Sequence, residues 1–141
     1  MLGAPMSLGS VNLLAVALSS LVAFGLNFVW FNILFRASYI AGLGRSQAQL
    51  DRGPSLPIAA ALQLAGYVVM ALVLAWLMQR TGNLSAGGGL KLAIILWLGV
   101  VVALLGPRYA FEAYSFTFFL INVGGPLAAL LSMGIILGAW R

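Results

Sequence analysis

Four long runs of apolar residues constrain the fold of this chain more than any other feature. They lie at about 11–35, 56–78, 90–106 and 115–140, and Lys91 is the single charged residue within them. At about 1.5 Å per helical residue, each run can cross a hydrocarbon core of about 30 Å, the third only with help from its flanks. Lipid offers no water to backbone N–H and C=O groups, so such runs must form helices that satisfy these groups internally.

We therefore predict an all-α fold, an integral membrane bundle of four transmembrane helices that forms a single domain over residues 1–141. The composition agrees with this prediction, because 63% of the residues are hydrophobic and only 6% are charged. The runs also lack the alternating polarity of the strands of a membrane barrel. Pro126 lies inside the fourth run and removes a backbone donor, so the fourth helix is expected to be kinked there.

The segments between the runs are short. The glycine-rich stretch 79–89, "QRTGNLSAGGG", has no apolar pattern and is expected to form a flexible loop. Gly106 and Pro107 are expected to end the third helix. The two connections on one side of the membrane hold four basic residues, and the other side holds Arg80, Lys91 and Arg141. This near balance leaves the orientation open by charge count alone.

We predict a multi-pass protein of the bacterial cytoplasmic (inner) membrane with both termini on the same side. An outside position is favoured, because residues 1–10 contain no basic residue to hold the amino terminus inside. Four residues are expected to anchor the helices at the membrane interface: Trp30, Arg36, Lys91 and Trp140. Trp76 and Trp97 are assigned to the same interfacial belts.

The residue types make an enzyme improbable. The chain has no cysteine and no histidine, and its carboxylates are limited to Asp51 and Glu112. These absences remove the usual ligands of zinc, copper and haem, so we expect no metal site, no cofactor and no catalytic residues. The net charge of +5 comes from scattered basic residues, which membrane topology explains better than binding to nucleic acid.

Small residues at helical spacing mark the expected helix contacts, because helices in lipid associate where their backbones approach closely. The favoured interpretation is packing within the chain, with a dimer face as the alternative. The expected packing residues are Ala15, Ser19 and Ala23 in the first run, Gly99 and Ala103 in the third, and Gly134 and Gly138 in the fourth.

Three amides fall at one depth, at roughly 10–12 Å from the same face of the membrane: Asn27, Gln63 and Asn122. Hydrocarbon cannot satisfy their hydrogen-bonding groups, so they are expected to bond one another or a backbone carbonyl freed near Pro126. The first interpretation is thus a polar layer that fixes how the helices pack.

The alternative interpretation makes this layer the floor of a cavity. Arg108 and Glu112 are four residues apart, within ion-pairing reach on a helix, and would lie at the mouth of the cavity. Tyr109 and Tyr114 would be flanking hydrogen-bond donors.

Residues 12–39, "NLLAVALSSLVAFGLNFVWFNILFRASY", resemble the amino-terminal signature of a bacterial membrane family catalogued as domain of unknown function 1761. The shared features are a glycine, a tryptophan, a Leu-Phe pair and a later aromatic, here Gly25, Trp30, Leu34, Phe35 and Tyr39. The stretches "LWLG" (96–99), "FE" (111–112), "FFLIN" (118–122) and "MGIILGAW" (133–140) are also similar. The resemblance implies a four-helix membrane protein of about this length and no particular activity.

These features favour a small non-catalytic membrane protein, an accessory or structural subunit that packs against other membrane helices, lipids or pigments of a larger complex. The expected partners are membrane lipids and other transmembrane subunits or further copies of the chain. The alternative is a carrier or channel for a small neutral solute, which would pass through the layer of Asn27, Gln63 and Asn122.

Overall fold

The computed structural model describes residues 11–140, which form helices and contain no strand. Four helical stretches are long and apolar enough to cross a membrane: Leu13–Leu34, Leu56–Thr81, Ala86–Phe111 and Phe116–Ala139. The prediction of an all-α fold with four membrane-spanning helices is therefore confirmed. The predicted single domain also extends over residues 1–10 and 141, which lie outside the described residues.

Two of the four spans contain a π-helical segment. The first span consists of α1 (Leu13–Val29) and η2 (Trp30–Leu34), and the third of α5 (Ala86–Leu96), η3 (Trp97–Val102) and α6 (Ala103–Phe111). The second and fourth spans are the single helices α4 (Leu56–Thr81) and α7 (Phe116–Ala139). A π-helical turn is wider than an α-helical one, so it shifts the residues that follow onto another face of the span.

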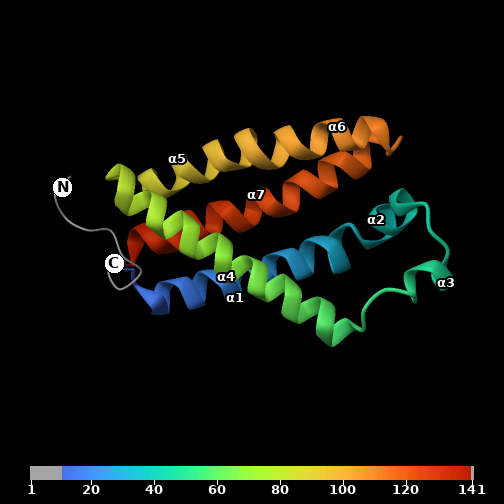
Figure 1. The fold of residues 1–141 in the computed structure, drawn as a ribbon, viewed down its shortest axis with the longest axis horizontal. Coiled ribbons are helices and arrows are strands. Elements are labelled where there is room, and N and C mark those ends of the chain that lie inside the picture. Colours follow the sequence, from blue (N-terminus) through green and yellow to red (C-terminus); the bar gives the residue numbers. More distant parts are fainter. Residues whose placement is uncertain (1–10, 141) are drawn as a thin grey trace.

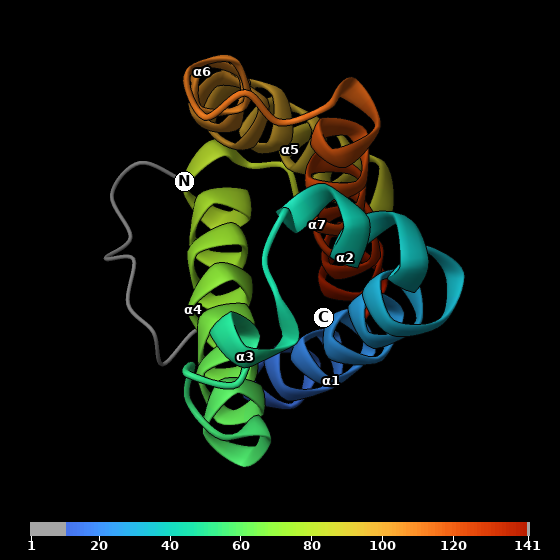
Figure 2. The same ribbon diagram turned by 90° about the vertical axis from the view of Figure 1, so that its right-hand side faces the viewer.

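Helix α7 is the central element of the bundle. Helices α5 and α1 pack against it most extensively, and α4 packs mainly against α1. Figures 1 and 2 show this arrangement, with the short helices α2 (Arg36–Leu43) and α3 (Gln47–Leu50) at the end of the bundle where α7 begins. At the other end, Asn12 Nδ2 donates to the Trp140 carbonyl at 3.3 Å. The start of α1 and the end of α7 thus lie on the same side.

The buried core lies toward this second end. Its fully buried members include Ala15 of α1, Leu74 of α4 and Met133 of α7. Helix α4 contributes only from Tyr67 onward, and its first half diverges from α7 (Figure 1). Consequently the side chains at 56–59 and 61–63 of α4 are exposed outside the bundle.

Helices α5 and α7 approach each other at backbone distance. A Cβ atom on Gly89 would collide with the backbone of Gly134, and one on Gly138 with the backbone of Ser85 and Ala86. Glycines on both helices therefore permit a contact that larger residues would prevent.

The connection between the second and third spans is shorter than the predicted loop at 79–89 and consists of residues 82–85. Helix α4 continues to Thr81, and α5 already begins at Ala86, where the Ser85 hydroxyl accepts from the Gly88 N–H at 3.0 Å. Gly89 packs directly against Gly134 of α7, and this packing offsets the low helix propensity of glycine.

The third helix also does not end at Gly106 and Pro107, because α6 runs through them to Phe111. Proline is tolerated within membrane helices where local π-helical adjustment satisfies the freed backbone groups, and η3 directly precedes α6. Helix α7 likewise continues through Pro126, and the kink there stays a prediction.

Gly99 and Ala103 do not pack within the bundle as predicted. Both are exposed, and a Cβ on Gly99 would meet no atom within 4 Å. Gly99 lies in η3 and Ala103 follows it, so the face expected from α-helical spacing is displaced by the wider turn.

Candidate functional site

Three side-chain N–H groups from two neighbouring spans bond to the backbone of α7. The contacts are Asn27 Nδ2 to the Gly125 carbonyl at 3.0 Å, Trp30 Nε1 to Ile121 at 2.9 Å and Trp97 Nε1 to Val123 at 2.7 Å. Each carbonyl oxygen has a second lone pair that can accept a bond besides the one within the helix. We call Asn27, Trp30 and Trp97 the α7 donors; they join the first and third spans to the central helix.

The three predicted amides take different places. Asn27 is buried, and its amide also donates to Ala23 of its own helix at 3.3 Å. Asn122 donates to Phe118 within α7 at 2.9 Å. Gln63 is exposed on α4, where it bonds to the side chain of Tyr67.

The structure therefore shows no layer of mutually bonded amides among residues 11–140. Two amides do bond backbone carbonyls, and only Asn27 does so between helices. Gln63 takes no part, because the first half of α4 diverges from α7.

The tryptophans also differ from expectation. Trp97 lies eleven residues after Ala86, roughly 16 Å along the span, which is deeper than an interfacial belt. An indole N–H at that depth needs a hydrogen-bond acceptor. The depth of Trp97 in the sequence was therefore the signal that it bonds to a neighbouring helix. Trp30 is also partly buried, over Gly124. Arg36, Lys91 and Trp140 are exposed, and their anchoring role stays a prediction.

The small residues of the first span line its contact face. Ala15, Ser19 and Ala23 are all fully buried, and the Ser19 hydroxyl donates to the Ala15 carbonyl at 2.6 Å. This face leads directly to Asn27, one turn beyond Ala23.

A pocket of about 190 Å³ opens between α2, α6 and the start of α7, and we call it the aromatic pocket. Figure 2 shows these elements at the end of the bundle that faces the viewer. Its lining includes residues of the predicted cavity, but Asn27 and Gln63 are absent. The lining residues are Tyr39, Leu43, Leu105, Arg108, Tyr109, Glu112, Tyr114, Phe118, Phe119 and Asn122.

Ring contacts build the walls of the aromatic pocket. Phe118 lies between two tyrosines, with ring centroids 5.5 Å from Tyr39 and 4.4 Å from Tyr114. Tyr109 contacts Phe119 at 5.0 Å. The connection to α7 turns sharply at Ala113, whose φ of 56° is unusual for a residue with a side chain. This turn brings Tyr114 back against the first turn of α7.

Arg108 and Glu112 form an ion pair at the rim, with Nη2 and Oε1 3.1 Å apart. Their side chains are 63% and 40% exposed, so water weakens the attraction. Such a pair contributes about 0.3–0.5 kcal/mol. The rim thus presents one positive and one negative group, held together weakly.

Tyr39 was not among the predicted site residues. It lies in α2, outside the spans, and burial raises the pKa of its hydroxyl. Nearby Tyr114 raises this pKa further, whereas Arg45 lowers it. The pocket therefore keeps a neutral phenol beside its charged rim.

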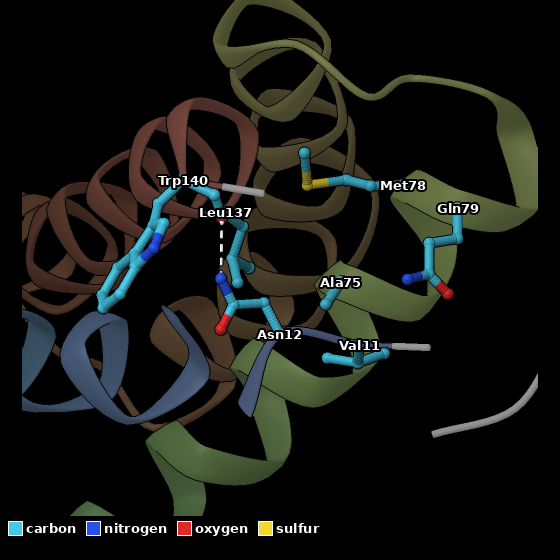
Figure 3. Close-up of a pocket in the computed structure, with 7 residues that line it drawn as sticks. All are labelled: Val11, Asn12, Ala75, Met78, Gln79, Leu137 and Trp140. Atoms are coloured by element: carbon cyan, nitrogen blue, oxygen red, sulfur yellow. Dashed lines mark hydrogen bonds between the residues drawn. The ribbon is translucent and has the colours of Figure 1, made fainter. Parts of the chain in front are cut away.

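A second, smaller cavity of about 60 Å³ lies at the other end of the bundle, where Asn12 meets Trp140 (Figure 3). It is lined by Val11, Asn12, Ala75, Met78, Gln79, Leu137 and Trp140. Within residues 11–140, no group of three or more His, Cys, Asp or Glu side chains is placed to hold a metal ion.

Comparison with known proteins gives a single result. The family model described as "Protein of unknown function (DUF1761)" matches residues 14–138, nearly the whole chain. No curated protein and no solved structure matches the chain.

Proposed function

The chain belongs to the DUF1761 family, whose function is unknown, and from this premise we propose that it is a small non-catalytic protein of the bacterial cytoplasmic membrane. Its role is that of an accessory or structural subunit, which packs against other transmembrane helices of a larger complex. The observation that carries this proposal is the outward position of Gln63 on α4.

Gln63 lies seven residues into α4, roughly 10 Å along the span. An amide has two donors and two acceptor positions, and the bond to Tyr67 uses only part of them. Hydrocarbon offers no partner to the remaining donors and acceptors of the amide, whereas polar or backbone groups of a second helix do. The amide therefore favours a protein neighbour over lipid at this position.

The surroundings of Gln63 suit a helix. Ala59 and Gly66 lie on the same face, and a Cβ on Gly66 would meet no atom within 4 Å. These residues, with Tyr67 and Met70, line a shallow groove of about 330 Å³. We call this surface the α4 face; its small residues permit the close backbone approach by which membrane helices associate.

The carrier alternative is less well supported. It needs Asn27, Gln63 and Asn122 along one path, but Asn27 bonds to Gly125, Asn122 lies at the aromatic pocket and Gln63 faces outward. A subunit role needs no such path.

Site-specific crosslinking in native membranes tests the proposal. A photoreactive amino acid replaces Gln63, and in a matched variant it replaces Leu104, which is 63% exposed on α6. We expect the probe at 63, and not the probe at 104, to form an adduct with another transmembrane protein. Mass spectrometry of the complex purified in a gentle detergent identifies that protein.

A second pair of variants separates specific packing from capture by chance. Gly66→Phe adds a ring to the α4 face at a position where a Cβ meets no atom within 4 Å, and Gly99→Phe places the same ring on another exposed helix surface. We expect only Gly66→Phe to abolish the adduct and release the partner. Lipid adducts alone at position 63, together with a lone monomer in gentle detergent, would overturn the proposal.

A further inference from the structure

We propose that the aromatic pocket binds the head group of a zwitterionic phospholipid, with the phosphate on Arg108 and the ammonium group on Glu112. This site lies between α2, α6 and α7, away from the α4 face, so it stands independently of the proposed subunit role.

The depth of the pocket matches the head-group layer. The third span has 26 residues and α7 has 24, so at about 1.5 Å per residue they measure about 39 and 36 Å. Both exceed the hydrocarbon core of about 30 Å, which places their terminal turns among the lipid head groups. Tyr109, Glu112 and Tyr114 belong to these terminal turns and the connection between them.

The backbone positions of the two charged residues follow the order that a zwitterionic lipid requires. Helix α6 runs outward toward Phe111, so the Cα atom of Arg108 lies about 6 Å deeper than that of Glu112, whereas the charged groups of the closed pair are 3.1 Å apart. In a zwitterionic phospholipid the phosphate is attached to the glycerol, and the ammonium group lies beyond it toward water. Once the pair opens, the guanidinium can therefore extend at the deeper level of the phosphate, and the carboxylate can stay at the outer level of the ammonium group.

The rim is also able to open. The pair is exposed and its two groups are bonded through Oε1 of Glu112 alone, which leaves Oε2 and further guanidinium N–H groups for a ligand. A purely anionic head group would meet Glu112 as a like charge, and a purely cationic one would meet Arg108. A ligand with both charges satisfies both.

The remaining lining complements a lipid head group. The tyrosine hydroxyls, at Tyr39, Tyr109 and Tyr114, are able to donate to phosphate or ester oxygens, and their rings offer faces to an ammonium group. Leu43 and Leu105 supply apolar contact. A volume of about 190 Å³ is below the range of about 300–1,000 Å³ for drug-sized ligands and suits a head group alone.

Native mass spectrometry of the full chain with added lipids of matched acyl chains tests this site. The probes are phosphatidylethanolamine, phosphatidylcholine, phosphatidylglycerol and diacylglycerol. We expect the two zwitterionic lipids to be retained at least about ten-fold more tightly than the other two, because each charged group gains a partner.

The decisive variant exchanges the two charges, Arg108→Glu with Glu112→Arg. It keeps the net charge and an ion pair at the same helical spacing, but it reverses the order of charges with depth. We expect about a ten-fold loss of zwitterionic lipid binding, with an unchanged helical circular dichroism spectrum. The control variant Lys91→Gln removes a charge distant in sequence from the pocket and should bind these lipids as the wild type does.

Three outcomes would overturn the proposal. The first is equal retention of diacylglycerol, which would show that acyl chains alone are bound. The second is preference for phosphatidylglycerol, or full lipid retention by the charge-exchanged variant. The third is binding of soluble glycerophosphoethanolamine with no phospholipid bound, which would identify a free solute as the occupant.

Discussion

At the scale of single residues, the most informative contacts are those that place a polar group where no water reaches it. Asn27, Trp30 and Trp97 each place an N–H group against a carbonyl of α7. Interhelical hydrogen bonds in lipid are worth about 0.6–2 kcal/mol each. The α7 donors therefore stabilise one register of three spans rather than dominating the stability of the bundle.

Replacing Asn27 tests this estimate. Asn27→Leu removes the bond to Gly125, and we expect the free energy of unfolding in detergent to fall by about 0.6–2 kcal/mol. Circular dichroism during denaturation measures it. Asn32→Leu, at an exposed position of η2, is the matched control and should change little. Equal stability of both variants and the wild type would show that the Asn27 amide contributes nothing.

Tyr39 predicts a pH dependence in the alkaline range. Burial raises the pKa of its hydroxyl above 10.0, so the unfolded chain loses this proton at a lower pH than the folded chain. The stability that the protonated hydroxyl contributes to the folded state is fully present below pH 10.0 and is lost as the pH rises through the folded pKa. We expect Tyr39→Phe to show a smaller fall in unfolding midpoint between pH 9 and about 12. If the unfolding midpoint of the variant falls as much as that of the wild type, Tyr39 is not a source of the pH dependence.

At the scale of helices, glycines have opposite roles that depend on what faces them. Gly89 and Gly134 meet backbone to backbone across α5 and α7, whereas Gly25 and Gly99 face open space. The two π-helical segments begin at Trp30 and Trp97, the residues that donate their indole N–H groups to α7. Wider turns at these places change which residues of the first and third spans face the central helix.

The contact between α5 and α7 predicts the effect of a single methyl group. Gly134→Ala forces the two backbones apart, and we expect a loss of about 1–3 kcal/mol in the free energy of unfolding. Gly25→Ala adds the same methyl group to a helix position with free space, and it should stabilise by up to about 1 kcal/mol. Denaturation in detergent measures both variants. A Gly134→Ala protein as stable as Gly25→Ala would contradict the close approach.

At the scale of the whole molecule, the four spans form an asymmetric bundle. The core is concentrated where the chain's described ends meet, and the other end holds α2, α3 and the aromatic pocket. Helix α4 is packed over only part of its length, so the α4 face remains uncovered by this chain.

The number of spans predicts the positions of the chain's ends relative to the membrane. Asn12 and Trp140 meet at one end of the bundle, so reporters fused before residue 1 and after Arg141 should show the same sidedness, with the outside favoured. Paired reporters that function only outside or only inside provide the measurement. Opposite results for the two fusions would contradict the four-span topology.

The sequence by itself determined the fold class and the number of spans, because long apolar runs in lipid have no alternative to helices. It also predicted that small residues of the first run would share a face, since Ala15, Ser19 and Ala23 follow α-helical spacing. It misplaced Gly99 and Ala103, because the wider turns of η3 break that spacing.

Only the tertiary structure decided which polar groups meet. Depth along a span is readable from the sequence, but the direction in which each amide points is not. Gln63 faces outward because α4 diverges from α7, whereas Asn27 bonds to Gly125 and Asn122 lies at the aromatic pocket. Helix contacts in lipid depend on local shape, and hydrophobic pattern says little about which face meets which neighbour. Gly89 of α5 packs against Gly134 of α7, and Tyr39 stacks on Phe118 of α7 at the aromatic pocket.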